Sequence, residues 1–388
     1  MPRTVLVGST LLDPSSPRPD PVARTIVIED GRIADCLAPD AHADGERIDA
    51  TGLWAIPGLV DARYTPFQHR TVRDAPAHLQ SVAQNLLPEQ RSLQRWLESG
   101  VTSLCSVGAP HNLDIELRDA LARGIVRGPR LFAAGCPISA YSGGKLQDAG
   151  VSVEASGVDH ARRVARDQIK ATADLLVACL GAHVCPWADA SLLIALDELE
   201  IRAVVDEAQH ASVPVYAMCS SPQTMQSAVS AGVNAVVPMY SLDANTMQGA
   251  QDSRTALVSV AARLMKNARG LAVAQAVKEA FRDGITFLLG SGSRCEHWRV
   301  AEHGRLLVDA GVDPYHVLQA LTIRPAQLFG REREFGSLQP GCVADIVLLD
   351  RNPADCIANL AEVRVVLQAG RVAYRRKDVE GRDTLTQH

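Results

Sequence analysis

Side chains that transfer protons near neutral pH stand just after several apolar runs of the sequence. The acid–base candidates placed in this way are Tyr141, Lys145, His183, Glu296 and His297. Imidazole titrates near neutrality, and carboxyl, phenol and amine groups also act as general acids or bases when they meet in one site. We therefore expect catalytic proton transfer to use members of this set. The alternative for each residue is a solvated position on a surface loop.

Arg63 is a further catalytic candidate because it lies inside the apolar run 59-LVDARYT-65. A guanidinium among apolar groups requires an anionic partner and can hold a carboxylate or phosphate through two hydrogen bonds. The sequence thus suggests that Arg63 binds an anionic part of a substrate. Pairing with the nearby Asp61 is the structural alternative.

Aromatic residues are scarce, at four Trp, six Tyr and six Phe in 388 residues, yet several stand at the ends of apolar runs. Apolar walls with a few polar groups are typical of small-molecule sites. Packing of loops onto the core is the alternative for any one of the rings. The candidates for substrate binding, aromatic and other, are Tyr64, Thr65, Phe67, His69, Trp187, Tyr216, Met218, Cys219, Tyr240 and Trp298.

The chain has nine cysteines, without a C-x-x-C pair. An odd number at scattered spacings argues against a disulfide framework and a zinc ribbon, and favours reduced thiols in the cytoplasm. Cys105, Cys179 and Cys219 could act as nucleophiles if a histidine lay beside one of them. Buried cysteine more commonly serves as a small apolar residue.

The elements that would position these groups alternate between strands and helices. Such alternation predicts a parallel sheet, and eight units fit a TIM barrel with its site on the loops after the strands. The eight expected strands are 59–63, 101–108, 129–135, 174–181, 213–219, 233–239, 255–260 and 285–292. A doubly wound open sheet is the alternative, but no glycine-rich phosphate loop follows the first strand.

Both ends of the chain instead carry short apolar runs separated by turns, including an Asp30-Gly31 pair that predicts a hairpin. We therefore expect residues 1–56 and 336–388 to build one small β domain, and residues 57–335 to form the barrel.

Charge and hydropathy limit the partners. The net charge is -5 and no basic cluster stands out, so neither nucleic acid nor a membrane surface is expected as a partner. The apolar runs fall far short of the roughly 18 residues that span a bilayer. A small-molecule substrate or ligand is the expected partner of a soluble protein.

Several motifs resemble the amidohydrolase superfamily, particularly its imidazolonepropionase-like and Xaa-Pro dipeptidase-like branch. They include 52-GLWAIPGLVDA-62, 231-AGVNAVVPM-239, 283-DGITFLLGSGS-293, 336-GSLQPGCVADIVLLDRNP-353 and 363-VRVVLQAGRV-372. The resemblance implies a (β/α)8 TIM barrel flanked by a β-sandwich from both termini. It also implies one or two divalent metals held by strands 1, 4, 5, 6 and 8, and it is compatible with a homodimer.

The family's ligand positions are occupied here by other residue types. The six positions that the resemblance assigns to metal ligands carry Arg63, Thr65, Val177, Met218, Pro238 and Gly292. None of these offers an imidazole or a carboxylate to a hard divalent ion, and the charge of Arg63 opposes metal entry. We therefore expect a metal-free barrel without a cofactor.

Three functions remain open. The first is a metal-independent enzyme that cyclises, eliminates, isomerises or decarboxylates a small, partly apolar substrate by acid–base and electrostatic catalysis. The second is a non-catalytic scaffold or ligand-binding protein. The third is a C–N bond hydrolase whose metal ligands have moved to His69, His183, Cys219 or His297.

Overall fold

The computed structural model describes residues 3–16, 21–67, 82–140, 152–180, 196–238, 244–259, 278–279, 282, 284–291 and 299–377. The chain divides into two compact units, and each is described by itself. One unit comprises Met1–Val60, Arg95–Thr102 and Pro314–His388, and the other comprises Asp61–Gln94 and Ser103–Asp313.

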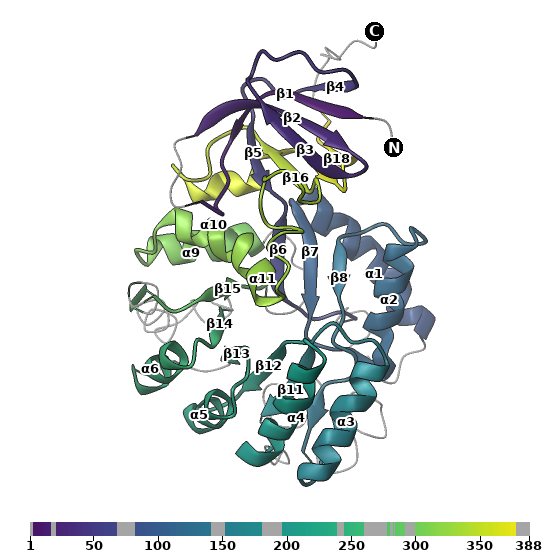
Figure 1. The fold of residues 1–388 in the computed structure, drawn as a ribbon, viewed down its shortest axis with the longest axis vertical. Coiled ribbons are helices and arrows are strands. Elements are labelled where there is room, and N and C mark those ends of the chain that lie inside the picture. The colour runs from purple at the N-terminus through teal and green to yellow at the C-terminus, as the bar shows by residue number, and fades with distance from the viewer. Residues whose placement is uncertain are drawn as a thin grey trace. The chain divides into compact units, whose positions relative to one another are not determined.

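The first unit contains an eight-stranded sheet built from both ends of the chain (Figure 1). Its order is β18 (Arg371–Arg375), β17 (Val363–Gln368), β16 (Ile346–Leu349), β5 (Trp54–Pro57), β1 (Thr4–Leu11), β2 (Val22–Glu29) and β3 (Arg32–Leu37), with β4 (Glu46–Asp49) paired to β1. The β domain expected from the two termini is therefore present, and hydrogen bonds join its strands into one sheet.

Turn chemistry and apolar patterning explain this sheet. Asp30 and Gly31 both have positive φ, 48° and 78°, as the tight turn between β2 and β3 requires. Apolar side chains from both ends of the chain form one buried core, among them Leu6, Ile26 and Leu348. The same unit holds α10 (Pro314–Ala320), α11 (Ile323–Leu328) and a 3-10 helix, η3 (Ile357–Ala361).

The second unit follows the strand–helix alternation of the TIM-barrel fold, and the first two residues of its strands at Leu59–Tyr64 and Val101–Ser106 belong to the first unit. Its principal strands are β6 (Leu59–Tyr64), β7 (Val101–Ser106), β8 (Arg130–Phe132), β11 (Leu176–Leu180), β12 (Val215–Cys219), β13 (Ala235–Pro238), β14 (Ala256–Ser259) and β15 (Phe287–Leu289). The predicted barrel with a terminal β domain is confirmed.

Hydrogen bonding does not close these strands into one continuous sheet. Among the described residues, β6, β7 and β8 form a three-stranded sheet, and a seven-stranded sheet runs from β10 (Val153–Glu154) and β9 (Ile138–Ser139) through β11 to β15. The third barrel strand is split: β8 pairs with β7, whereas β9 pairs with β11. The segment 133–137 lies between these two pairings.

Helices alternate with the strands. They are α1 (Val82–Glu98), the 3-10 turn η2 (Pro110–Asn112), α2 (Leu113–Ala122), α3 (Val158–Lys170), α4 (Glu198–His210), α5 (Pro222–Ser230), α6 (Ala244–Asp252) and α9 (Arg299–Asp309). Asp197 begins α4 with a capping box to Glu200. Within the described part of the chain, no helix combines the length and the apolar character needed to cross a membrane.

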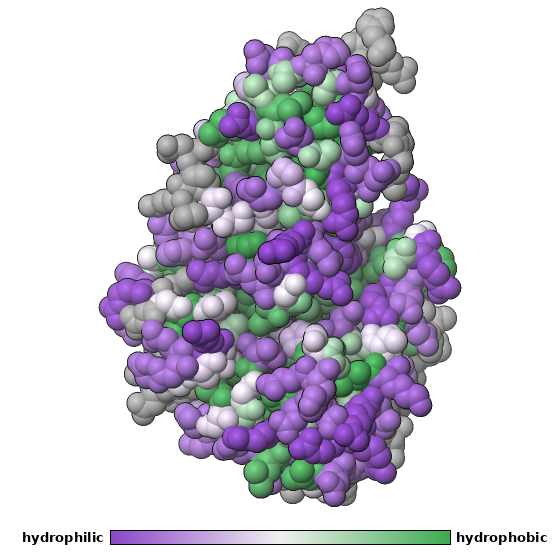
Figure 2. Space-filling view, viewed as in Figure 1, coloured by the Kyte–Doolittle hydropathy of each residue, from purple (hydrophilic) through white to green (hydrophobic). Residues whose placement is uncertain are grey.

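The surface of α3 and α4 is polar. Arg162 and Arg166 of α3 form ion pairs with Glu207 of α4, with N–O distances of 3.1 and 2.7 Å. Figure 2 shows hydrophilic side chains over this part of the visible face, with a few apolar ones among them. Such partly exposed pairs contribute little to stability, so they orient the two helices rather than define a site.

Candidate functional site

Asp61, Arg63 and Thr65 lie on one side of β6 and its continuation, because alternate residues of a strand share a face. Asp61 is fully buried, Arg63 is 1% exposed and Thr65 is 6% exposed. The Oδ1 atom of Asp61 accepts a hydrogen bond of 2.8 Å from the backbone N–H of Arg63. The strand thus places a buried carboxyl group, a guanidinium and a hydroxyl in sequence along one face.

The end of β15 holds this face in position. The backbone N–H of Ser291 donates to Oδ2 of Asp61 at 3.0 Å. Burial raises the pKa of Asp61, while its hydrogen bonds with Ser291 and Arg63, and the charge of Arg63, work in the opposite direction. The Asp61 side chain therefore links the first and last strands of the barrel.

The face of β6 that carries Asp61 points into the barrel interior. The charge of Asp61 acts on both Tyr216 of β12 and Cys105 of β7, and this phenol and thiol lie close enough to shift each other's pKa. Strands β7 and β12 belong to different sheets, so these side chains can meet only inside the barrel. Burial raises the pKa of both groups far above their usual values, which keeps them protonated.

Apolar side chains cover the interior faces of the neighbouring strands. Val177 of β11 is paired with Tyr216, and Met218 of β12 is paired with Val237 of β13. Because Tyr216 faces the interior, these paired positions face it too, and all are buried. The interior therefore has apolar walls beside the polar groups of β6.

The hydroxyl of Thr65 is buried and has no hydrogen-bond partner among the described residues. A buried hydroxyl without a partner costs about 1–3 kcal/mol of folding stability. A ligand atom that accepted a hydrogen bond from the Thr65 hydroxyl would offset this cost. Its predicted role in substrate binding stays a prediction.

Tyr64 and Phe67, two of the residues predicted to bind substrate, both contact a buried acid of α1. The Tyr64 hydroxyl forms a hydrogen bond with Glu89 of α1, and Oε2 of Glu89 accepts the backbone N–H of Phe67 at 2.7 Å. Phe67 has a positive φ of 61°. Burial raises the pKa of Glu89 to about 8. These contacts fix the chain at the end of β6.

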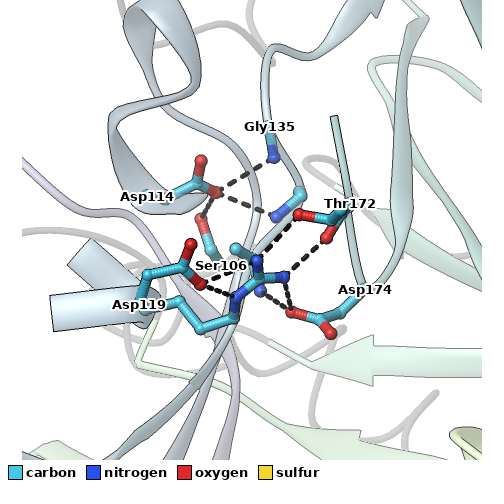
Figure 3. Close-up of polar contacts among 9 residues, drawn as sticks. Ser106, Asp114, Asp119, Gly135, Thr172 and Asp174 are labelled. Carbon is cyan, nitrogen blue, oxygen red and sulfur yellow. Dashed lines mark hydrogen bonds and ion pairs between the residues drawn. The ribbon is translucent and has the colours of Figure 1, made fainter. Parts of the chain in front are cut away.

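A third buried carboxyl group, that of Asp114, holds the break in the third barrel strand (Figure 3). Oδ2 of Asp114 accepts hydrogen bonds from the Ser106 hydroxyl at 2.7 Å and from the backbone N–H groups of Ala134 and Gly135 at 2.9 and 3.2 Å. Burial raises the pKa of Asp114 to about 6. Through these hydrogen bonds, Asp114 anchors the segment 134–135 to the end of β7.

An ion pair supports the same segment. Nη1 of Arg118 donates to Oδ2 of Asp174 at 2.9 Å, and the same oxygen accepts the backbone N–H of Ala133 at 2.9 Å. Arg118 also donates to Asp119 and Thr172, and Figure 3 labels all three of its partners, Asp119, Thr172 and Asp174. Sequence reasoning singled out neither this pair nor Glu89 and Asp114. A single acid within an amphipathic helix gave no signal of the tertiary contact that it makes.

The three cysteines considered as nucleophiles are buried. Burial raises the thiol pKa of both Cys105 and Cys219. Cys219 donates to the Ala217 carbonyl at 3.6 Å, and Cys179 lies on the interior side of β11 opposite Met218. Because a neutral thiol is a poor nucleophile, Cys105 and Cys219 fit the alternative of small apolar residues.

Most of the predicted site residues lie outside the described part of the chain. These are Tyr141, Lys145, His183, Glu296 and His297 among the catalytic candidates, and His69, Trp187, Tyr240 and Trp298 among the binding candidates. Of the catalytic set, Arg63 is described, and of the binding set Tyr64, Thr65, Phe67, Tyr216, Met218 and Cys219 are described.

The positions that the family resemblance assigns to metal ligands do not provide a suitable donor set where they are described. They offer the guanidinium of Arg63, the hydroxyl of Thr65 and the apolar side chains of Val177 and Met218. Both carboxyl oxygens of the neighbouring Asp61 already accept hydrogen bonds. In the described ranges, no three His, Cys, Asp or Glu residues are grouped so as to hold a metal ion. These residues do not fit a divalent cation.

Comparison with known proteins identifies similar sequences and folds. The model of the amidohydrolase family matches residues 56–374. No curated protein matches the chain at a significant level.

Three solved structures have the same fold over nearly all of the chain. A Xaa-Pro dipeptidase with bound methionine has a TM-score of 0.85 at 22% identity, covering 96% of this chain and 100% of that one. An ochratoxinase of A. niger has a TM-score of 0.80 at 19% identity, covering 95% of each chain. A molinate hydrolase has a TM-score of 0.78 at 18% identity, covering 98% and 99%.

Proposed function

This chain belongs to the amidohydrolase family, and from that premise we propose that it is a metal-independent enzyme that acts on a small, partly apolar substrate. Cyclisation, elimination, isomerisation and decarboxylation are the reaction classes that fit, since each can proceed by proton transfer and charge stabilisation without an activated water.

One observation carries the proposal: a buried guanidinium occupies β6 at a position that the family assigns to a metal-binding histidine. Arg63 is 1% exposed and its charge acts on Asp61 in the barrel interior. A fixed positive charge with low water exposure can stabilise negative charge that develops on a substrate. Arg63 would thereby supply electrostatic stabilisation where relatives use a metal.

The other roles follow from what each side chain can do. Tyr216, Met218 and the aliphatic residues of β11 and β13 provide apolar walls for the substrate. Tyr141, Lys145, His183, Glu296 and His297 remain the proposed proton donors and acceptors, and His69, Trp187, Tyr240 and Trp298 remain proposed contacts at the mouth.

Turnover in the absence of metal tests this proposal. Chelator-treated protein is incubated with a library of small acids, lactones and amides, and conversion is followed by liquid chromatography with mass spectrometry, which also separates isomers of equal mass. We expect at least one conversion that persists under chelation and falls by about a hundredfold or more in Arg63→Met. Conversion that appears only after Zn²⁺ or Mn²⁺ is added would contradict the proposal.

A C–N bond hydrolase with relocated ligands is the second candidate. The fold shared with a Xaa-Pro dipeptidase and a molinate hydrolase favours it. His69, His183, Cys219 and His297 would then supply the ligands. The metal-addition arm of the same experiment detects it. A non-catalytic scaffold would show no conversion in either arm.

A further inference from the structure

The hydroxyl of Thr65 and the guanidinium of Arg63 offer complementary donors on one face of β6. Thr65 follows Arg63 by two residues, and the two side chains are buried in the same barrel interior. Within the part of the chain that the structure describes, the Thr65 hydroxyl has no hydrogen-bond partner. A guanidinium provides a planar fork of N–H donors that matches the two oxygens of a carboxylate. A bound carboxylate would satisfy the Thr65 hydroxyl while it pairs with Arg63.

We propose that Arg63 and Thr65 form a carboxylate-binding subsite, so that the ligand is a small carboxylic acid with an apolar remainder. The inference rests on the proposed function only in placing the substrate inside the barrel. Arg63 binds the carboxylate, and the Thr65 hydroxyl donates one hydrogen bond to it. The apolar part of the acid lies against the interior faces of β11 and β12, where Val177 and Met218 are found.

Charge balance favours a carboxylate over a phosphate. A carboxylate brings one negative charge into the buried site, whereas a phosphate dianion brings two. Asp61 lies two residues before Arg63 and would add to the repulsion in its ionised form. The lone hydroxyl of Thr65 also provides fewer donors than the oxygens of a phosphate accept.

The subsite is held in place before any ligand binds. The close approach of Gly290 to Arg63 and the hydrogen bond from Ser291 to Asp61 fix β6 against the end of β15. A rigid site loses less conformational entropy on binding, so a simple carboxylate fragment should bind measurably.

Ligand-induced thermal stabilisation tests the subsite with defined probes. Sodium acetate and sodium benzoate are titrated up to about 100 mM. Inorganic phosphate, neutral benzamide and sodium chloride at matched ionic strength serve as controls. The variants are Arg63→Met, Arg63→Lys, Thr65→Val and Thr65→Ser, and circular dichroism establishes that each variant is folded.

We expect saturable stabilisation by both carboxylates and none by phosphate or benzamide. Arg63→Met should weaken benzoate binding by about tenfold to a hundredfold, with a smaller loss in Arg63→Lys. Thr65→Val should weaken it by about five- to tenfold, and Thr65→Ser should restore it.

Thr65→Val separates a binding role from a structural one. Valine has the shape of threonine without the buried hydroxyl, so the ligand-free variant should unfold about 2 °C above the wild type. A melting temperature that rises while benzoate affinity falls is the expected signature. If Thr65 had only a structural role, Thr65→Val would lower the melting temperature and the benzoate affinity together.

Three results would overturn the subsite. They are no saturable response to either carboxylate, tighter binding of phosphate than of benzoate, or carboxylate binding that survives both Arg63→Met and Thr65→Val. Carboxylate binding is measured without turnover, so the subsite and the proposed function can be contradicted independently of each other. Carboxylate binding in a protein that requires metal contradicts the proposed function alone, whereas metal-independent turnover without carboxylate binding contradicts the subsite alone.

Discussion

Gly290 lies directly against Arg63: a Cβ atom added at Gly290 would fall 2.4 Å from the Cβ of Arg63 and 2.7 Å from its backbone nitrogen. The last barrel strand therefore approaches the first so closely that the residue facing Arg63 has no room for a side chain. This contact fixes the backbone and Cβ of Arg63 against the end of β15.

Gly290→Ala should accordingly destabilise the protein and displace Arg63. The added methyl group meets backbone and Cβ atoms, which cannot move as freely as a side-chain tip, so a loss of about 1–3 kcal/mol in the free energy of unfolding is expected. Urea denaturation followed by circular dichroism measures it.

Gly249→Ala is the matched control for this substitution. Gly249 lies in α6, and a Cβ there would meet its nearest neighbour at 3.7 Å, an ordinary contact. Alanine favours helix, so this variant should be neutral or up to about 1 kcal/mol more stable. Equal stability of the two variants would contradict the close packing of Gly290 on Arg63.

Glu89 gives the stability a pH dependence whose direction can be derived. Its pKa in the folded protein is about 8, raised by burial from an ordinary value of 4.5. At pH values between 4.5 and about 8, Glu89 holds a proton in the folded state that it has released in the unfolded state. The free energy of unfolding therefore falls as pH rises, by about 1.4 kcal/mol per pH unit for this group.

Glu89→Gln removes this contribution. The window from pH 6 to 8 is the useful one, because Asp114, whose pKa is about 6, contributes below it. Urea unfolding of wild type and variant at several pH values gives the difference in slope. A difference in stability that stays constant from pH 6 to 8 would show that Glu89 does not carry the proton.

Much of the fold could be predicted because its information is local. Apolar runs predicted strands such as β12 and β14, and the Asp30-Gly31 pair predicted the turn between β2 and β3. The break between α10 and α11 was not predicted. Thr322 there has φ of −135° and ψ of −86°, which interrupts the helix.

The contacts around the site were harder to predict because they join distant segments. Tyr64 and Glu89 are 25 residues apart, and Asp61 and Ser291 are 230 apart. Residue type and motif singled out Arg63, Thr65 and Tyr216 as candidates, but they did not show that Tyr64 and Phe67 would contact a buried glutamate. That contact depends on where α1 packs.

Asp114 should be more important for stability than its neighbour Asp119. Asp114→Asn replaces a carboxylate oxygen that accepts three hydrogen bonds, and an amide turned the wrong way would oppose two backbone N–H donors. A loss of about 1–3 kcal/mol in the free energy of unfolding is expected. Asp119→Asn, at an exposed ion pair with Arg118, should change stability by less than about 0.5 kcal/mol. Similar losses in both variants would contradict the anchoring role of Asp114.

Native mass spectrometry of the protein as purified tests the central claim, that Arg63 and its neighbours replace a metal site. The expected mass is that of the chain without a metal ion, with or without a bound small carboxylic acid. A mass showing one or two transition-metal ions per chain, retained through gel filtration and lost together with activity on chelation, would contradict it.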